Sequence, residues 1–167
     1  GTSTATVAGI LNASLRSDDD ETLAFLPFAA VGESWQARAM SHTAVTETPA
    51  AAAVDAMAHF AGLLSFETDC WDVHASLATS TPDFVLLDVR SSAAFTAGHA
   101  EGAVSLPRSS ISEDALAEYP SDTVFVVYCA GPHCNGADKA ALRLAHLGRP
   151  VKKMIGGVTG WLDEGFD

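Results

Sequence analysis

Two uninterrupted apolar runs, at residues 83–89 (DFVLLDV) and 123–129 (TVFVVYC), most constrain what this chain can fold into. Runs without polar alternation are typical of strands that are buried on both faces of a parallel sheet. Helical patterns separate these runs from each other and from further strand candidates at 64–68, 102–107 and 151–157. Strands that alternate with helices predict an α/β fold with a central parallel sheet flanked by helices.

The expected helices occupy residues 69–78, 91–99, 111–120, 136–148 and 158–166. Asp69 is expected to cap the first of them, because its carboxylate can accept from free amides of the first turn. Gly98 and Gly148 should end the second and the fourth helix, and Pro120 should end the third. The most apolar strand, 123–129, is expected at the centre of the sheet.

Composition divides the chain into three parts. Residues 1–48 include an acidic run (SDDDE) and a low-complexity segment, and we interpret them as an N-terminal arm or linker. Because the chain begins at Gly1 without Met, part of this arm is expected to be left over from expression. Alternatively, the arm docks on a partner or joins two copies as a homodimer. Residues 49–63 should form an accessory helix that caps a core through Val54, Met57, Ala61 and the adjoining Leu64. Residues 64–167 carry the α/β domain.

Charge and cysteine content limit the partners and the compartment. The 167 residues carry a formal net charge of −12 with only nine Lys and Arg, whereas nucleic-acid or anionic-membrane binding needs concentrated positive charge. No apolar run approaches membrane-spanning length. Three cysteines (Cys70, Cys129 and Cys134) do not make a disulfide scaffold, so we expect a reducing, cytoplasmic setting. No cofactor is expected.

Cys129 stands out because it ends the most apolar strand and precedes a loop of small residues that leads into a helix. Ligands of parallel α/β sheets bind beyond the carboxyl ends of the strands, and a helix N-terminus favours an anion such as a thiolate. This position predicts a lowered pKa of Cys129 and a nucleophilic role. Gly131, Pro132 and Gly136 suit a loop whose amides form an anion nest. The alternative is a small thiol that only packs in the core.

Three segments in order, LLDVRSSAAFTAGHAEGAVSLP, VVYC and KKMIGGVTGW, resemble the single-domain rhodanese-like (sulfurtransferase) family between Leu64 and Phe166. The first segment carries the Asp-x-Arg, Gly-His and Gly-Ala elements of that family, and the last matches its Gly-Gly-x-x-x-Trp signature. The resemblance implies a rhodanese-like domain in which a Cys129 persulfide carries sulfane sulfur. The donor would be a small molecule such as thiosulfate, and the acceptor a thiol, cyanide or a protein-borne thiol.

The resemblance also implies which residues build the site. Asp88 and Arg90 would form an ion pair that supports the loop. The loop backbone would bind the donor and hold the persulfide, through Ala130, Gly131, Pro132, His133, Cys134, Asn135, Gly136 and Ala137. Further residues are expected to be structural: Cys70, Trp71 and Trp161 in the core, and His99 in a buried backbone contact.

The loop CAGPHCNGA departs from the common family pattern because it contains no Arg or Lys. A loop without cations weakens the expectation for thiosulfate, which is anionic, and favours a neutral or protein-borne donor. The related phosphatases and arsenate reductases need Arg where this chain has Asn135, so phosphoryl chemistry is disfavoured. Lys139, in the first turn of the following helix, is the nearest cation expected.

Cys134 and His133 leave alternatives open. Cys134 could resolve a persulfide or sulfenate on Cys129 as a disulfide, or it could only fill a tight loop. His133 could donate to the bound anion or face solvent. Zinc binding by these residues with Cys129 is disfavoured, since they offer no clear fourth ligand, and no metal site is expected. A second function therefore stays open: a redox-sensing or binding module with a reversible Cys129–Cys134 disulfide and a protein partner.

Overall fold

The computed structural model describes residues 43–167 of the chain. Contacts divide the chain into a unit Gly1–Pro49 and a compact unit Ala50–Asp167. In the described part of the first unit, an exposed turn forms in which the amides of Thr46 and Glu47 donate to the carbonyl of Thr43 at 3.0 and 2.9 Å. The prediction of an arm over residues 1–48 falls mostly outside the described residues and stays a prediction.

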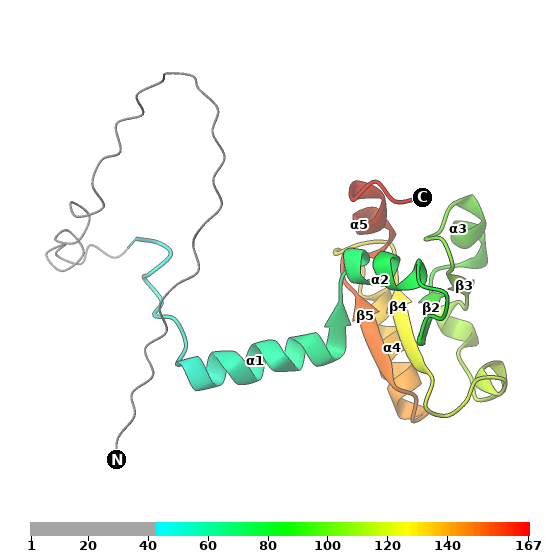
Figure 1. Ribbon diagram of the computed structural model, residues 1–167, viewed down its shortest axis with the longest axis horizontal. Coiled ribbons are helices and arrows are strands. Elements are labelled where there is room, and N and C mark those ends of the chain that lie inside the picture. The colour runs from blue at the N-terminus through cyan, green and yellow to red at the C-terminus, as the bar shows by residue number, and fades with distance from the viewer. Residues whose placement is uncertain (1–42) are drawn as a thin grey trace, which may run out of the picture. The chain divides into compact units, whose positions relative to one another are not determined.

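Five parallel strands form one sheet in the order β1-β5-β4-β2-β3 (Figure 1). The strands are β1 (Glu67–Thr68), β2 (Phe84–Asp88), β3 (Val104–Ser105), β4 (Val124–Tyr128) and β5 (Val151–Met154). The order confirms the predicted α/β fold and the central position of the 123–129 strand. Among residues 43–167, no helix combines the length and hydropathy needed to cross a bilayer.

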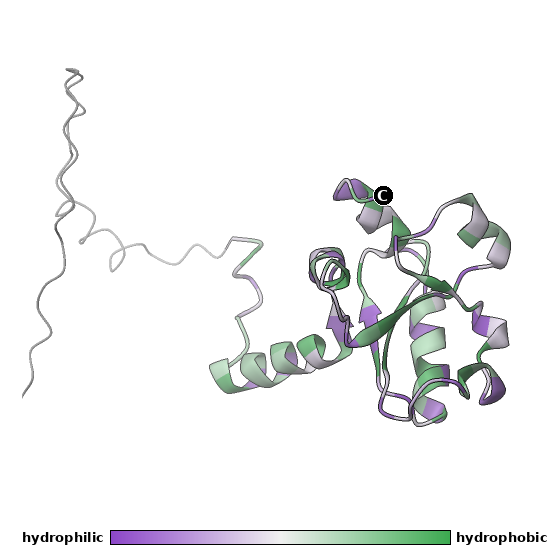
Figure 2. Cartoon of the chain, turned by 45° about the vertical axis from the view of Figure 1, so that its right-hand side comes forward, coloured by the Kyte–Doolittle hydropathy of each residue, from purple (hydrophilic) through white to green (hydrophobic). Residues whose placement is uncertain are grey.

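The side chains of the central strand point alternately into two cores, one on each face of the sheet. This double burial explains why its sequence is apolar without interruption. Phe125 and Val127 pack on one face of the sheet with Ala140 and Leu144 of helix α4 (Gly136–His146). Val126 packs on the other face, against α2 (Cys70–Leu77) and α5 (Gly157–Asp163). Figure 2 shows the resulting hydrophobic colour along the middle of the sheet.

The structure confirms several of the helix ends that the sequence predicts. The Asp69 carboxylate accepts from the amide of Asp72 at 2.8 Å and caps α2. Gly98 ends α3 (Ser92–Ala97), and Gly148, with a φ of 70°, follows the end of α4. Cys70 and Trp161 are buried in the second core, as predicted.

The helix predicted over 111–120 is wrong: only a single 3₁₀ turn forms, at Asp114–Leu116. An α-helix through this segment would pair the carbonyl of Leu116 with the amide of residue 120, which is Pro120 and has no N–H. Arg149 supplies the missing donors instead, to the carbonyls of Leu116, Tyr119 and Pro120 at 2.9, 3.0 and 2.6 Å.

Helix α1 (Ala53–Phe66) also differs from the expectation, since it replaces most of the strand predicted at 64–68. Within the described part of the chain α1 buries none of its residues, and Met57 is 69% exposed. The prediction that its apolar face caps the core is therefore wrong. Both faces of the sheet are already covered by α4 and by α2 with α5, which leaves α1 no core to cap.

Trp71 is a further correction, because it is 58% exposed rather than part of the core. Its indole N–H donates to the carboxylate of Glu164 at 2.9 Å, and its ring packs edge-on against Phe166. One residue earlier in α2, the buried Cys70 takes the position that faces the sheet.

Candidate active site

An open depression of about 650 Å³ lies where the segments that follow β2, β3 and β4 come together. Parallel strands present their carboxyl ends at the same edge, which is why three distant segments meet here. The depression is lined by Val89, Arg90, Ser91, Ser92, Pro107, Arg108, Ser109, Ser110, Cys129, Cys134, Asn135, Gly136 and Lys139.

The depression carries positive charge that the loop sequence does not supply. The loop itself lacks Arg and Lys, but Arg90, Arg108 and Lys139 all line the depression, and none of its described lining residues is acidic. Arg90 is paired with Asp88, whereas the side chains of Arg108 and Lys139 have no ion-pair partner among residues 43–167. Four serine hydroxyls share the lining. The arrangement suits an anionic ligand.

Two thiols meet in this depression. The Sγ atoms of Cys129 and Cys134 are 2.7 Å apart, and both cysteines are free. Cys129 follows the central strand directly and is 9% exposed, while Cys134 is less buried and lies just before the N-terminus of α4. One sulfur is thus enclosed and its neighbour is accessible.

The pKa values of the two thiols move in opposite directions. Burial, and then the hydrogen bond with Cys134, raise the pKa of Cys129, which contradicts the expected lowering. The hydrogen bond from Cys129, and then one from the backbone of Gly136, lower the pKa of Cys134. The lowered pKa expected for Cys129 is therefore found at Cys134. These directions make Cys134 the thiol of the pair that deprotonates first.

The loop is held from behind by the N-terminus of α5. The amides of Val158 and Thr159 donate to the carbonyls of Cys129 and Ala130, each at 3.0 Å. Gly157 has a φ of 62°, and a Cβ placed there would lie 2.5 Å from the carbonyl oxygen of Cys129. The Gly-Gly-x-x-x-Trp segment is therefore explained by close backbone packing against the loop.

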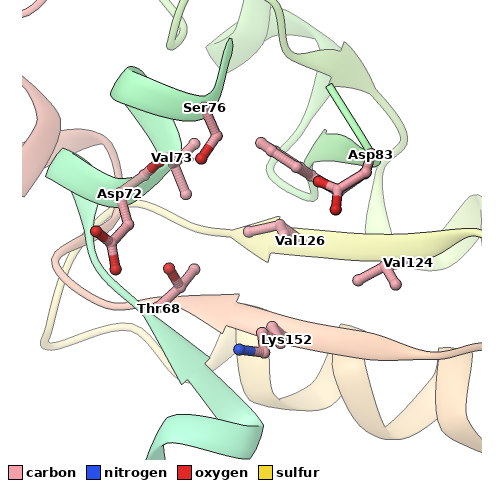
Figure 3. Close-up of a pocket in the computed structure, with 9 residues that line it drawn as sticks. Thr68, Asp72, Val73, Ser76, Asp83, Val124, Val126 and Lys152 are labelled. Atoms are coloured by element: carbon pink, nitrogen blue, oxygen red, sulfur yellow. Dashed lines mark hydrogen bonds between the residues drawn. The ribbon is translucent and has the colours of Figure 1, made fainter. Parts of the chain in front are cut away.

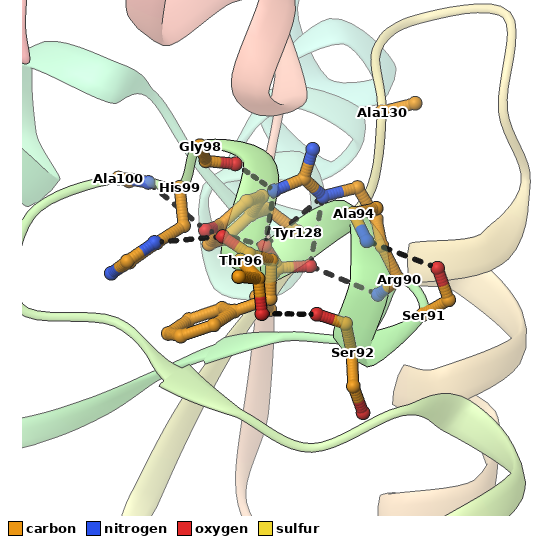
Figure 4. Close-up of polar contacts among 12 residues, drawn as sticks. Arg90, Ser91, Ser92, Ala94, Thr96, Gly98, His99, Ala100, Tyr128 and Ala130 are labelled. Carbon is orange, nitrogen blue, oxygen red and sulfur yellow. Dashed lines mark hydrogen bonds and ion pairs between the residues drawn. The ribbon is translucent and has the colours of Figure 1, made fainter.

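Asp88 and Arg90 form the predicted ion pair beside the depression (Figure 4). Asp88 is fully buried and also accepts from the Tyr128 hydroxyl at 2.9 Å, and that hydroxyl accepts from the amide of Ala100 at 3.1 Å. Arg90 Nη2 donates to the carbonyl of Gly98 at 2.6 Å. The hydrogen bond with Asp88 raises the pKa of Arg90, and burial raises the pKa of Tyr128. This network joins the ends of β2 and β4 to the turn after α3.

His99 lies outside this buried network. Its Nδ1 is 2.9 Å from the carbonyl oxygen of Phe95, and its ring stacks on Phe95 at 3.6 Å. The side chain contacts backbone as expected, but the residue is exposed rather than buried.

The predicted loop residues fall into three groups. Cys134, Asn135 and Gly136 line the depression with Cys129. Ala130, Pro132 and His133 line a second, shallow depression on the other side of Cys134. Gly131 and Ala137 are buried in the packing of the loop. His133 does not share the Cys129 depression, and its side chain is exposed.

Arg108 is the functional candidate that the sequence reading misses, together with the serines around it. It follows Pro107 directly after the strand predicted at 102–107. Its place after a strand is the signal that points to it, because ligands bind at the carboxyl ends of parallel strands.

A separate pocket of about 260 Å³ shares no lining residue with the Cys129 depression (Figure 3). It is lined from α2 by Asp72, Val73 and Ser76 and from the early residues of β2, β4 and β5. Lys152 at its wall donates to the carbonyl of Leu64 at 2.8 Å. No thiol or imidazole is among the described residues that line this pocket.

The fold and the thiol loop define a class of proteins that comparison with known families identifies. The family described as the rhodanese-like domain matches residues 72–164, more than half of the chain. The chain belongs to this family.

Individual relatives agree with this assignment. A crystal structure of a Bacillus halodurans protein is 36% identical and superposes with a TM-score of 0.66, covering 68% of this chain and 83% of that one. The rhodanese-like domain of an Anabaena protein is 26% identical with a TM-score of 0.54, covering 60% of this chain and 75% of that one. An HTH-type transcriptional regulator of Mycobacterium tuberculosis is 35% identical over 89 residues, which are 50% of this chain but only 39% of the regulator.

Proposed function

We propose that this chain is a sulfurtransferase-type persulfide carrier in which Cys129 accepts a sulfane sulfur and passes it to a thiol. The observation that carries the proposal is the pair of free thiols 2.7 Å apart at the end of the central strand. Membership of the rhodanese-like family supports the same reaction class. Thiosulfate, disfavoured by the loop sequence alone, becomes a suitable donor because Arg90, Arg108 and Lys139 line the depression.

Cys134 gives the buried Cys129 a neighbouring base. Cys129 Sγ attacks the outer sulfur of thiosulfate while its proton passes to the Cys134 thiolate. The bond between the two thiosulfate sulfurs breaks, and sulfite leaves with its electron pair. Cys129–S–S⁻ and a neutral Cys134 thiol remain, so the total charge is unchanged. An adjacent base is a general means of activating a nucleophile whose own pKa is high.

The persulfide formed in this step is an anion that the depression can stabilise. Backbone amides of Ala130 and Gly136 already lower the pKa of Cys134, so they present hydrogen-bond donors to sulfur at this point. An acceptor thiol, or cyanide in an assay, then removes the terminal sulfur and restores Cys129. Two half-reactions through one covalent intermediate predict ping-pong kinetics. The acceptor in the cell would be a small or protein-borne thiol, and the chain would act in the cytoplasm.

Steady-state formation of thiocyanate from thiosulfate and cyanide tests this proposal. Parallel double-reciprocal lines are expected for the wild type, with complete loss of turnover in Cys129→Ser. Cys70→Ala is the matched control, because Cys70 lies in the core on the other face of the sheet. Thiocyanate formation that survives in Cys129→Ser would overturn the assignment of the nucleophile.

A redox-sensing module is the second candidate function, and the same 2.7 Å contact favours it. In this case a peroxide would oxidise one thiol to a sulfenate, and the other thiol would convert it to a Cys129–Cys134 disulfide with loss of water. One relative is named a transcriptional regulator, which supports a domain that senses and binds a partner. Rapid disulfide formation with peroxide, without any thiocyanate formation, would favour this candidate over the first.

A further inference from the structure

The contact between the two thiols has a consequence for the loaded state of the carrier. A persulfide has two sulfurs that a thiol can attack: the outer one, which transfers sulfur, and the inner one, which releases it. An external acceptor reaches the outer sulfur. Cys134 already contacts the inner sulfur, which is Cys129 Sγ itself.

We infer that the Cys129 persulfide discharges onto Cys134 when no acceptor arrives, which forms the Cys129–Cys134 disulfide and releases hydrosulfide. This inference rests on the proposed persulfide function. It adds a sulfide-releasing activity to the transfer activity and assigns it to Cys134.

The step balances without any external oxidant. Cys134 Sγ attacks Cys129 Sγ, and the bond between Cys129 Sγ and the terminal sulfur breaks. The terminal sulfur leaves with the electron pair and takes the proton of Cys134, so Cys129–S–S⁻ and Cys134–SH become a disulfide and HS⁻. The two cysteines are oxidised to the disulfide while the sulfane sulfur is reduced to sulfide. A dithiol or glutathione-type reductant is needed only to reopen the disulfide.

The loop geometry brings the attacking and the attacked sulfur together. A shift of about 0.7 Å separates the observed 2.7 Å contact from the disulfide bond length of about 2.05 Å. The amide of Cys134 donates to the carbonyl of Gly131 at 3.0 Å, a turn that folds the loop back toward Cys129. Gly136 leaves the room for this approach, since a Cβ there would lie 2.5 Å from Cys129 Sγ.

The surroundings also favour the departure of an anion. The depression is open, has a volume of about 650 Å³, and carries three cationic side chains and no acidic one among its described lining residues. The third thiol, Cys70, cannot compete for the persulfide. It is buried on the opposite face of the sheet, where its S–H donates to the carbonyl of Ile155.

The test is a single anaerobic loading with thiosulfate, without cyanide or reductant and with a trap that removes sulfide as it forms. Sulfite, sulfide and the intact mass are followed in the wild type, Cys134→Ser, Cys129→Ser and Cys70→Ala. The wild type should release about one equivalent each of sulfite and sulfide and end two hydrogen atoms lighter. Cys70→Ala should behave in the same way, and a sample without thiosulfate should keep both thiols.

Cys134→Ser separates this inference from the proposed function. It should release sulfite, more slowly because it lacks the neighbouring base, and should retain one added sulfur without releasing sulfide. A wild type that keeps its added sulfur as stably as Cys134→Ser would overturn the discharge while leaving the carrier function intact. If neither protein releases sulfite or gains sulfur, the proposed function fails and the discharge fails with it.

Discussion

At the scale of single residues, the two neighbouring thiols of Cys129 and Cys134 lie in unlike environments. Burial at the end of a strand raises the pKa of Cys129, whereas hydrogen bonds at the start of a helix lower the pKa of Cys134. The lowered pKa that the sequence predicts for Cys129 therefore belongs to its neighbour Cys134. The accessible thiolate can act as base for the buried thiol.

The difference in pKa between the two thiols predicts how the transfer of sulfur from thiosulfate to Cys129 depends on pH. Sulfite release should rise with pH as the pair loses its first proton, with a midpoint below the ordinary thiol pKa of about 8.5. In Cys134→Ser the remaining thiol is buried and has no base, so its midpoint should move upward. Stopped-flow sulfite detection across pH measures both proteins. Equal midpoints would contradict the assignment of the lower pKa to Cys134.

Gly136 is the position where a single methyl group should disturb the pair. In Gly136→Ala the new Cβ would lie 2.5 Å from Cys129 Sγ and 3.3 Å from Cys134 Sγ, so the sulfurs must move. We expect sulfite release to fall by about 100-fold, a typical effect of displacing reacting groups. Circular dichroism should show the fold retained.

Gly62→Ala is the matched control for that substitution. Gly62 lies in α1, and a Cβ there meets no atom within 4 Å. This variant should keep full sulfite release and gain about 0.5–1 kcal/mol of stability, because alanine suits a helix interior better than glycine. A comparable loss of activity in both variants would mean that the effect at Gly136 is not local.

At the scale of elements, the buried side chains of Asp88 and Tyr128 connect neighbouring strands. Asp88 ends β2 and Tyr128 ends β4, and the two residues pair in the register of the sheet. Their hydrogen bond, and the contact of Arg90 with Gly98, fix the segment after β2 that forms one wall of the depression. Removing one partner would leave a buried polar group unpaired.

Tyr128→Phe tests this connection. The substitution removes the hydroxyl that donates to Asp88 and accepts from the amide of Ala100. We expect a loss of about 1–3 kcal/mol in the free energy of unfolding, measured by urea denaturation. Tyr119→Phe is the control, because the Tyr119 hydroxyl has no hydrogen-bond partner among residues 43–167 and its ring packs on Phe125. Equal effects of the two substitutions would contradict a structural role for the Tyr128 hydroxyl.

An element can be predicted from the sequence when its own residues determine its structure. It cannot be predicted when contacts with residues far along the chain determine it. Strands β2 and β4 are predictable because burial on both faces of the sheet leaves a nearly unbroken apolar run in each sequence. The 111–120 segment is not, since the side chain that satisfies its carbonyls, Arg149, lies on a distant segment. The apolar face of α1 has the right spacing for a core helix, but spacing does not say whether a core is available.

The candidate site shows the same limit. Cys129 is predictable because it follows the central strand directly. The charge of its surroundings is not, because Arg108 comes from the segment after β3 and enters through tertiary structure. The pKa of Cys129 depends on the side chain of Cys134, whose approach follows from a loop turn that residue types alone do not reveal.

At the scale of the whole molecule, a chain with a net charge of −12 presents a cationic depression at its thiols. Arg108 is exposed and has no ion-pair partner in the described residues, so it is free to attract an anionic donor. Local charge, rather than net charge, should therefore decide which donor enters.

Arg108→Gln tests this point. The KM for thiosulfate should rise by about two- to fivefold, the range of an exposed ion pair, with little change in kcat. Lys152→Gln makes the same change of charge at the separate pocket and should leave KM unchanged. Steady-state kinetics at low ionic strength compare the two. Equal KM values in both variants would remove Arg108 from donor binding.

Intact-mass spectrometry of the thiosulfate-treated Cys134→Ser variant would show whether Cys129 carries a persulfide. This variant cannot form the Cys129–Cys134 disulfide, so the loaded state should persist. We expect a gain of one sulfur atom, located on the peptide that contains Cys129 and lost when cyanide is added. An unchanged mass, or a sulfur atom located on Cys70, would contradict it.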